Sequence, residues 1–252
     1  MLKDYYFDYE QTNQLPDFLI IGAQKSGTTS LFRYIIQHPN VIPAVKKEIH
    51  FFNNPDHFNK GIDWYKAQFP QLDKNEISIT GEATPNYLEH SHIPKKVFKL
   101  MPNVKLIVIL RNPVDRVYSN YHYRIKRGLE NLSFEQVISN EEKLIKKGKT
   151  TQARYLYRGF YAEHLKEWMR YFPKEQFLIL QSEEFFKDPS KNINQLISFL
   201  ELPSSNIETS RKYNVGKYSP MYEETRNRLN EFYKPHNDRL CNLLGRNFGW
   251  NY

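Results

Sequence analysis

Short apolar runs alternate with segments of helical periodicity along most of the chain. The runs Phe18–Gly22 and Val104–Leu110 are almost continuously apolar and too short for a core helix, so we predict that both are buried strands. A third strand is predicted at Phe177–Leu180, and a weaker one at Ile77–Thr80. Strands that are apolar on both faces are typical of parallel sheets covered by helices.

Helices are predicted between these strands. Tyr161, Leu165 and Trp168 are spaced i, i+4 and i+7, which places them on one face of a helix. Another helix begins at Asn112-Pro113, because asparagine caps helices and proline is favoured at their first position. The other helical segments cover residues 28–37, 93–100, 134–147, 193–200 and 223–244, and the last of these is interrupted near Lys234-Pro235.

This alternation predicts an α/β protein with a central parallel sheet flanked by helices on both faces. Residues 1–16 have the character of a peripheral arm, and no change in composition marks a second domain within residues 17–252. A chain of 252 residues is long enough to bury a substantial core. We therefore predict an N-terminal arm followed by a single domain.

Composition narrows the classes of function. The chain carries 36 Lys and Arg against 28 Asp and Glu, and the resulting net charge of +8 favours anionic partners. The single cysteine, Cys241, excludes an internal disulfide framework and a cysteine-based zinc site, and it fits a reducing compartment. The N-terminus lacks the apolar core of a secretion signal, and we see no transmembrane segment, so we expect a cytoplasmic protein.

The segment after the first predicted strand has the composition of a phosphate-binding loop. It reads Gly-Ala-Gln-Lys-Ser-Gly-Thr-Thr-Ser over residues 22–30 and leads into a helix, whose N-terminal amides favour anions. Gly22 and Gly27 have the spacing of the ATP-binding P-loop, but Thr28 stands where that loop has its lysine. The cation is instead Lys25, so the loop is P-loop-like only. The alternative is a tight turn with a helix-capping Ser/Thr cluster.

A second candidate anion site follows the strongest predicted strand. Arg111 stands directly after that strand, where an ATPase has an acidic residue that helps to hold Mg²⁺. A planar guanidinium suits a second phosphate, and Ser119 on the following helix is placed to donate to the same group. The alternative is an Arg–Asp surface pair followed by an ordinary helix serine.

Together these two segments resemble the nucleotide loops of sulfotransferases, which use 3′-phosphoadenosine 5′-phosphosulfate (PAPS). The resemblance rests on Lys-Ser-Gly-Thr-Thr at residues 25–29 and on Arg-Asn-Pro-x-Asp-Arg-x-x-Ser at residues 111–119. Residues 47–52 and 81–87 resemble segments of the heparan-sulfate group, and residues 158–168 and 244–250 also match. The resemblance covers nearly the whole chain and implies the sulfotransferase fold. Soluble bacterial and polyketide-associated sulfotransferases are similar as well.

The resemblance implies a role for each matching position. Lys25 would contact the bridging oxygen of the transferred sulfate and help the phosphate to leave. The 3′-phosphate would be held by Arg111 and Ser119. The residues that would cradle the 5′-phosphate are Ser26, Gly27, Thr28, Thr29 and Ser30. The family's late nucleotide loop is most nearly matched by Gly216, Lys217 and Tyr218, with Lys217 as the phosphate contact.

By the same resemblance, Glu48 would be the general base that takes the acceptor's proton. Apolar neighbours favour a raised carboxyl pKa, whereas the two preceding lysines, Lys46 and Lys47, favour a lowered one. His50 is the competing base, since histidine titrates near neutral pH. The structural alternative for Glu48 is a salt bridge to one of the lysines, and for His50 a packing role.

Two other functions are weighed against PAPS-dependent sulfuryl transfer: a kinase-like phosphotransferase and a basic nucleic-acid-binding protein. A kinase-like phosphotransferase requires a P-loop lysine and a metal-binding carboxylate, and the sequence has neither at the required places. The sequence also has no recognisable nucleic-acid-binding motif. No residue cluster has metal-ligand spacing, so we predict transfer without a metal. Ala83 stands where glycan enzymes often have lysine, which favours a smaller or less charged acceptor. We leave the acceptor open as a small molecule, lipid, carrier-bound group or saccharide, and we expect no nucleic acid.

Overall fold

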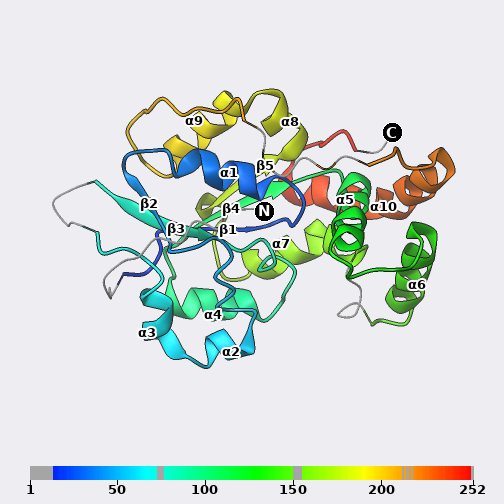
Figure 1. The fold of residues 1–252 in the computed structure, drawn as a ribbon, viewed down its shortest axis with the longest axis horizontal. Coiled ribbons are helices and arrows are strands. Elements are labelled where there is room, and N and C mark those ends of the chain that lie inside the picture. Colours follow the sequence, from blue (N-terminus) through cyan, green and yellow to red (C-terminus); the bar gives the residue numbers. More distant parts are fainter. Residues whose placement is uncertain are drawn as a thin grey trace.

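Within the residues that the computed structural model describes (14–72, 77–149, 155–211, 213, 216 and 218–250), five parallel strands form one central sheet (Figure 1). β1 pairs with β3 on one side and with β4 on the other. The spatial order β2-β3-β1-β4-β5 joins β1 (Phe18–Gly22), β2 (Val41–Pro43), β3 (Ile79–Ala83), β4 (Lys105–Leu110) and β5 (Phe177–Gln181). The predicted parallel sheet is confirmed.

Helices cover both faces of this sheet, as predicted (Figure 1). One face carries α1 (Thr28–Ile35), α8 (Ser182–Lys187) and α9 (Pro189–Phe199). The opposite face carries α2 (Pro55–Phe58), α3 (Gly61–Lys66), α4 (Ile93–Leu100) and α7 (Tyr161–Met169). Beside the sheet, a third apolar cluster joins α5 (Pro113–Lys126), α6 (Phe134–Lys146) and α10 (Glu223–Leu244).

The sheet separates two hydrophobic cores because neighbouring residues of a strand point to opposite faces. Ile20 of β1 and Ile107 of β4 pack in the core on the α1 side, whereas Ile21 and Val108 pack in the other. Every residue of β1 is buried. Burial of both faces explains why β1, and β4 after Lys105, are apolar.

Several elements differ from the sequence-based prediction. α10 runs through Pro235 without the predicted interruption, because Tyr233 before the proline and Leu240 after it are both held in apolar clusters. β3 lies later than predicted and includes Glu82, whose charge hid the strand pattern. The sequence analysis also missed β2 and the short helices α2, α3 and α8.

Only residues 14–16 of the predicted arm belong to the described chain, and Leu15 packs against the core that contains α7. The division into an arm and one domain therefore stays a prediction. Among the described residues, no helix combines the length and the apolar character that a membrane span requires.

Candidate active site

The loop between β1 and α1 is shaped by the backbone of Gly27. This residue has a φ of 106°, and a Cβ atom there would lie 2.9 Å from the ring of Phe186, so a side chain is excluded both by conformation and by space. Gly27 is the N-cap of α1, and no side chain caps the helix. Thr28 and Thr29 form the first turn. The N-terminus of α1 is therefore built as the sequence analysis expects for an anion-binding loop.

The hydroxyl of Ser26 fits such a ligand. Ser26 is fully buried, and its Oγ atom lies near the Tyr161 hydroxyl but makes no hydrogen bond of ordinary geometry among the described residues. A buried polar atom without a partner costs about 1–3 kcal/mol, a cost that an oxyanion bound at this loop would remove. Ser30 is oriented differently, because its Oγ accepts a 3.2 Å hydrogen bond from the backbone N–H of Tyr213. This contact ties the late loop to α1.

Lys25 and Arg111 bring the two predicted anion sites together. Nη1 of Arg111 donates a 3.2 Å hydrogen bond to the carbonyl oxygen of Lys25. Burial and the neighbouring Arg111 guanidinium lower the pKa of Lys25 to about 8, although the Glu48 carboxylate acts in the opposite direction. Cations that crowd one another in this way define an electropositive centre suited to a multiply charged anion.

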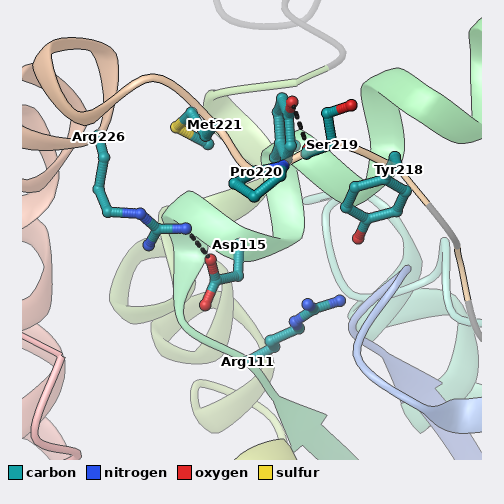
Figure 2. Close-up of a pocket in the computed structure, with 8 residues that line it drawn as sticks. Arg111, Asp115, Tyr218, Ser219, Pro220, Met221 and Arg226 are labelled. Carbon is teal, nitrogen blue, oxygen red and sulfur yellow. Dashed lines mark hydrogen bonds and ion pairs between the residues drawn. The ribbon is translucent and has the colours of Figure 1, made fainter.

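Arg111 also lines an open pocket of about 190 Å³, shown in Figure 2. The segment that contains Tyr218 lies alongside α5 and forms one wall. Ser119 is buried in α5 and is absent from the described lining of the pocket. The complete described lining is Arg111, Asp115, Tyr118, Tyr218, Ser219, Pro220, Met221 and Arg226.

The late loop reaches the pocket at one of its three predicted residues, and its contact with a nucleotide stays a prediction. Tyr218 reaches the Arg111 pocket, and its ring stacks on His122 of α5 with centroids 4.4 Å apart and planes 2° apart. Gly216 is exposed, and a Cβ atom at this position would lie 2.4 Å from the Tyr218 ring. Lys217, the expected phosphate contact, lies outside the described residues.

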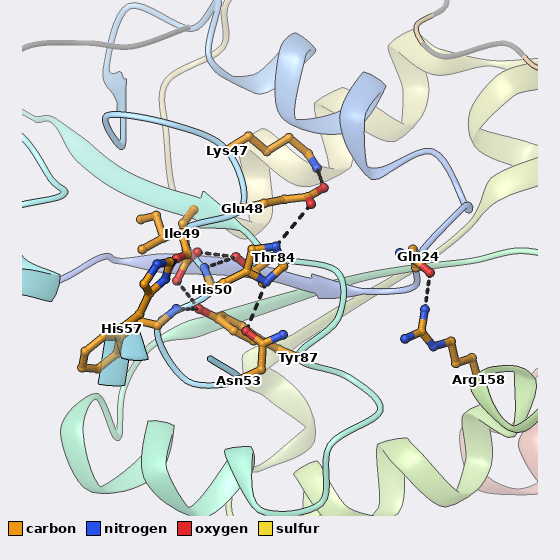
Figure 3. Close-up of polar contacts among 12 residues, drawn as sticks. Gln24, Lys47, Glu48, Ile49, His50, Asn53, His57, Thr84, Tyr87 and Arg158 are labelled. Atoms are coloured by element: carbon orange, nitrogen blue, oxygen red, sulfur yellow. Dashed lines mark hydrogen bonds and ion pairs between the residues drawn. The ribbon is translucent and has the colours of Figure 1, made fainter. Parts of the chain in front are cut away.

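Glu48 and His50 lie in an irregular segment between β2 and α2 (Figure 3). Both have left-handed backbones, with φ values of 66° and 57°. Nε2 of His50 lies 3.5 Å from Oε2 of Glu48, and Nζ of Lys47 donates to Oε1. The two candidate bases are thus in contact with one another, and the lysine salt bridge weighed for Glu48 is present too.

The contacts set the pKa values of this pair. Burial raises the pKa of Glu48, but the hydrogen bond from His50 and the charge of Lys47 outweigh it and bring the pKa to about 2. The side chain is 44% exposed, so burial is incomplete. The raised pKa that apolar neighbours favoured is therefore wrong. The hydrogen bond to Glu48 raises the pKa of His50, although burial opposes it.

A hydrogen-bond network around Glu82 holds this segment in place. Glu82 is fully buried in β3 and accepts hydrogen bonds from the hydroxyls of Tyr65 (2.7 Å), Thr84 (2.6 Å) and Tyr87 (3.1 Å). Burial raises its pKa despite these bonds. The Tyr87 hydroxyl in turn accepts from the backbone N–H of Phe51 at 2.9 Å. The network fixes the backbone directly after His50.

A second network, which the sequence analysis missed, reaches the donor loop. Arg158 forms a 2.8 Å ion pair with Glu89 and donates to the side-chain oxygen of Gln24 (Figure 3). Gln24 directly precedes Lys25. Arg158 begins one of the segments that carry the resemblance, so the sequence marked this residue as a candidate. The sequence did not reveal that its partners are Gln24 and Glu89.

The sulfotransferase domain family model matches residues 15–236. The chain belongs to this family. It is 30% identical to a sulfotransferase from Alicyclobacillus acidocaldarius, with a TM-score of 0.81 over 95% of this chain and 100% of that one. This membership decides against the phosphotransferase and nucleic-acid-binding alternatives.

Two further comparisons are more distant or partial. The human bifunctional heparan sulfate N-deacetylase/N-sulfotransferase 3 is 31% identical over 96% of this chain, which spans only 31% of that protein. A mouse sulfotransferase complexed with PAP has a TM-score of 0.50 at 22% identity, over 79% of this chain and 61% of that one, which shows a shared fold alone. Among the described residues, no group of three or more His, Cys, Asp or Glu is arranged to hold a metal ion.

Proposed function

We propose that this sulfotransferase moves the sulfuryl group of PAPS to a hydroxyl or amine of an acceptor. The observation that carries the proposal is the 3.2 Å contact between Arg111 Nη1 and the carbonyl oxygen of Lys25, which joins two anion-binding loops. PAPS carries a 5′-phosphosulfate and a 3′-phosphate, one for each loop. The mouse structure of similar fold, complexed with PAP, supports the same choice of donor.

In the proposed donor pose, the 5′-phosphosulfate lies at residues 25–30 and the 3′-phosphate lies at Arg111. The unpartnered Oγ of Ser26 then gains a partner. Arg111 is the side chain that separates PAPS from adenylyl sulfate, which has no 3′-phosphate. Ser119 is buried in α5 and does not line the described pocket, so its assignment to the 3′-phosphate rests on the family resemblance alone.

The transfer of the sulfuryl group needs no reactant besides PAPS and the acceptor. The acceptor oxygen or nitrogen attacks sulfur, the S–O bond to the 5′-phosphate breaks, and that oxygen leaves with the electron pair. The acceptor's proton passes to Glu48. Lys25 stabilises the negative charge that develops on the leaving oxygen. A sulfuryl group carries less charge than a phosphoryl group, so fixed cations and amides suffice for an in-line transfer.

Glu48 and His50 act as one unit in this proposal. A carboxylate whose pKa is about 2 is ionised at neutral pH but is a weak base. Deprotonation of His50 removes the imidazolium that stabilises the Glu48 carboxylate, and the basicity of Glu48 then rises. His50 therefore sets the strength of the base and orients it.

The acceptor is proposed only as a class: a small molecule, lipid, carrier-bound group or saccharide. Ala83 is fully buried in the core on the α1 side, so this position offers no cation to an anionic acceptor. A cytoplasmic location stays a prediction from the sequence.

The direct test of this proposal is an acceptor screen with ³⁵S-labelled PAPS, read by mass spectrometry. We expect a labelled product whose mass increases by one sulfuryl group and whose formation depends on Lys25. Lys25→Ala should slow formation of the product by roughly 10²–10³-fold, whereas Lys99→Ala, which alters an exposed lysine of α4, should not slow it. A product that forms equally well in Lys25→Ala, or no labelled product with any acceptor in the screen, would contradict the proposal.

A further inference from the structure

The ring of Tyr123 connects α5 to the donor loop. Nζ of Lys25 lies 4.4 Å from the centroid of this ring, and the guanidinium carbon of Arg127 lies 5.1 Å from it. Tyr123 lies in the last turn of α5 and Arg127 is the C-cap of that helix, whereas Lys25 follows β1. One aromatic side chain therefore contacts the lysine to which we assign stabilisation of the leaving group.

Lys25 needs such a partner because its surroundings repel a positive charge. Burial is the largest of the effects that lower its pKa to about 8, and Arg111, Lys47 and Arg127 add to it. The carboxylate of Glu48 acts in the opposite direction. A pKa of about 8 lies so close to neutral pH that a modest further decrease leaves a large fraction of the side chain uncharged.

An aromatic ring can offset this repulsion. The face of a phenol ring carries partial negative charge and attracts an ammonium within about 6 Å of its centroid. Unlike a carboxylate, the ring adds no full negative charge to a site that has to accept an anionic donor. It also leaves the three ammonium hydrogens available, because it takes up none of them in a conventional hydrogen bond.

We propose that Tyr123 positions Lys25 in the donor loop and keeps its side chain in the ammonium form before the donor binds. This inference rests on the proposed function, because it concerns the lysine to which that proposal assigns stabilisation of the leaving oxygen. Tyr123 is a positioning residue, since it contacts Lys25 and not the donor. The described residues provide no hydrogen bond for its hydroxyl, so the ring alone carries the effect.

The test compares Tyr123→Leu, which removes the ring, with Tyr123→Phe, which keeps it. The quantity measured is kcat/KM for PAPS as a function of pH, because this ratio reports ionisations of the free enzyme. In Tyr123→Leu, we expect the loss of activity at alkaline pH to begin roughly one pH unit lower than in the wild type. Tyr123→Phe should retain the wild-type profile. Identical profiles for all three proteins would overturn the proposal.

A second readout does not depend on activity. Lysine side chains labelled with ¹³C-methyl groups titrate individually in NMR spectra, and the Lys25 resonance is the one that Lys25→Arg lacks. We expect its pKa to fall in Tyr123→Leu and to rise in Arg127→Gln, where a repelling cation is removed. If the wild type transfers no sulfuryl group but these shifts occur, the proposed function fails and the inference stands. If Tyr123→Leu does not shift the titration of Lys25, the inference fails, whatever Arg127→Gln does.

Discussion

Nε2 of His50 lies 3.5 Å from Oε2 of Glu48, and both residues have left-handed backbones. For residues other than glycine this conformation costs roughly 1–2 kcal/mol each, so surrounding contacts have to hold it in place. The hydrogen bond from Glu48 N–H to the carbonyl oxygen of Ala83, at 3.1 Å, is one such contact. The structure thus presents the two candidate bases as a pair and not as rivals.

The pair predicts how transfer depends on pH. The pKa of His50 is raised from its usual value of 6.5 by the hydrogen bond to Glu48, against the effect of burial. Below that raised pKa the imidazolium weakens Glu48 as a base; above it the imidazole is neutral and Glu48 is stronger. Single-turnover transfer should therefore increase as pH rises through a value above 6.5.

Two variants separate the roles of the pair. Glu48→Gln should reduce the single-turnover rate by roughly 10²- to 10⁴-fold with donor affinity unchanged, because a lost general base costs about this much. His50→Asn should abolish the rise with pH and keep part of the rate. If Glu48→Gln remains active while His50→Asn does not, the roles are reversed, and if both remain active, the base lies elsewhere.

Lys25→Ala should impair turnover far more than donor affinity. The charge on the leaving oxygen increases during transfer, so an interaction with it is stronger in the transition state than in the bound ground state. We expect a loss of roughly 10²–10³ in kcat. The dissociation constant for PAP should change much less. The reverse pattern, with affinity lost and turnover kept, would make Lys25 a binding residue only.

Tyr87→Phe should reduce both stability and transfer. The Tyr87 hydroxyl donates to Glu82 and accepts from Phe51 N–H, so its removal deprives two buried groups of a partner. We expect a loss of about 1–3 kcal/mol in the free energy of unfolding. Tyr65→Phe is the matched control, because Tyr65 donates to Glu82 but, among the described residues, makes no hydrogen bond to the 48–52 backbone.

Comparing Tyr87→Phe with Tyr65→Phe separates the effect of the network on the position of the base from its effect on stability. Chemical denaturation should show that both variants are destabilised, but only Tyr87→Phe should also slow single-turnover transfer at a temperature where both are folded. Equal rates in the two variants would show that the network stabilises the fold without positioning the base.

Glu82 also predicts a pH dependence of stability. Burial raises its pKa in the folded protein above the ordinary value of 4.5. The folded state therefore binds this proton more tightly than the unfolded state, and its contribution to stability is lost as pH rises from about 4.5 through the folded pKa. Denaturation at several pH values should show a shallower decline over this range in Glu82→Gln than in the wild type. Parallel slopes would contradict the assignment.

The features that the sequence predicted correctly are local ones. The buried strand β1 and the loop after it bring Lys25, Gly27 and several hydroxyl residues together within residues 18–30, so the pattern can be read from neighbouring positions. The cap of α5 is equally local, since the Asn112 side chain accepts a 2.9 Å hydrogen bond from Val114 N–H. Such short-range patterns determine structure wherever the rest of the fold is compatible with them.

The features that the sequence could not predict depend on distant partners. Arg158 and Gln24 are 134 positions apart, and no pattern along the chain pairs them. The pKa of Glu48 depended on whether Lys47 and His50 point toward it, which an irregular segment does not reveal. At Pro235 the sequence predicted an interruption that the structure lacks. Tertiary packing on both sides of the proline outweighed the local helix-breaking signal.

The central claim, that the chain binds PAPS through two phosphate sites, is tested most directly by calorimetric titration with PAP and with adenosine 5′-phosphate. The two ligands differ only in the 3′-phosphate that we assign to Arg111. The account predicts that PAP binds roughly ten- to a hundred-fold more tightly, as the loss of a charge-assisted contact implies, and that Arg111→Ala abolishes the difference. Equal affinities of the wild-type protein for the two nucleotides would contradict it.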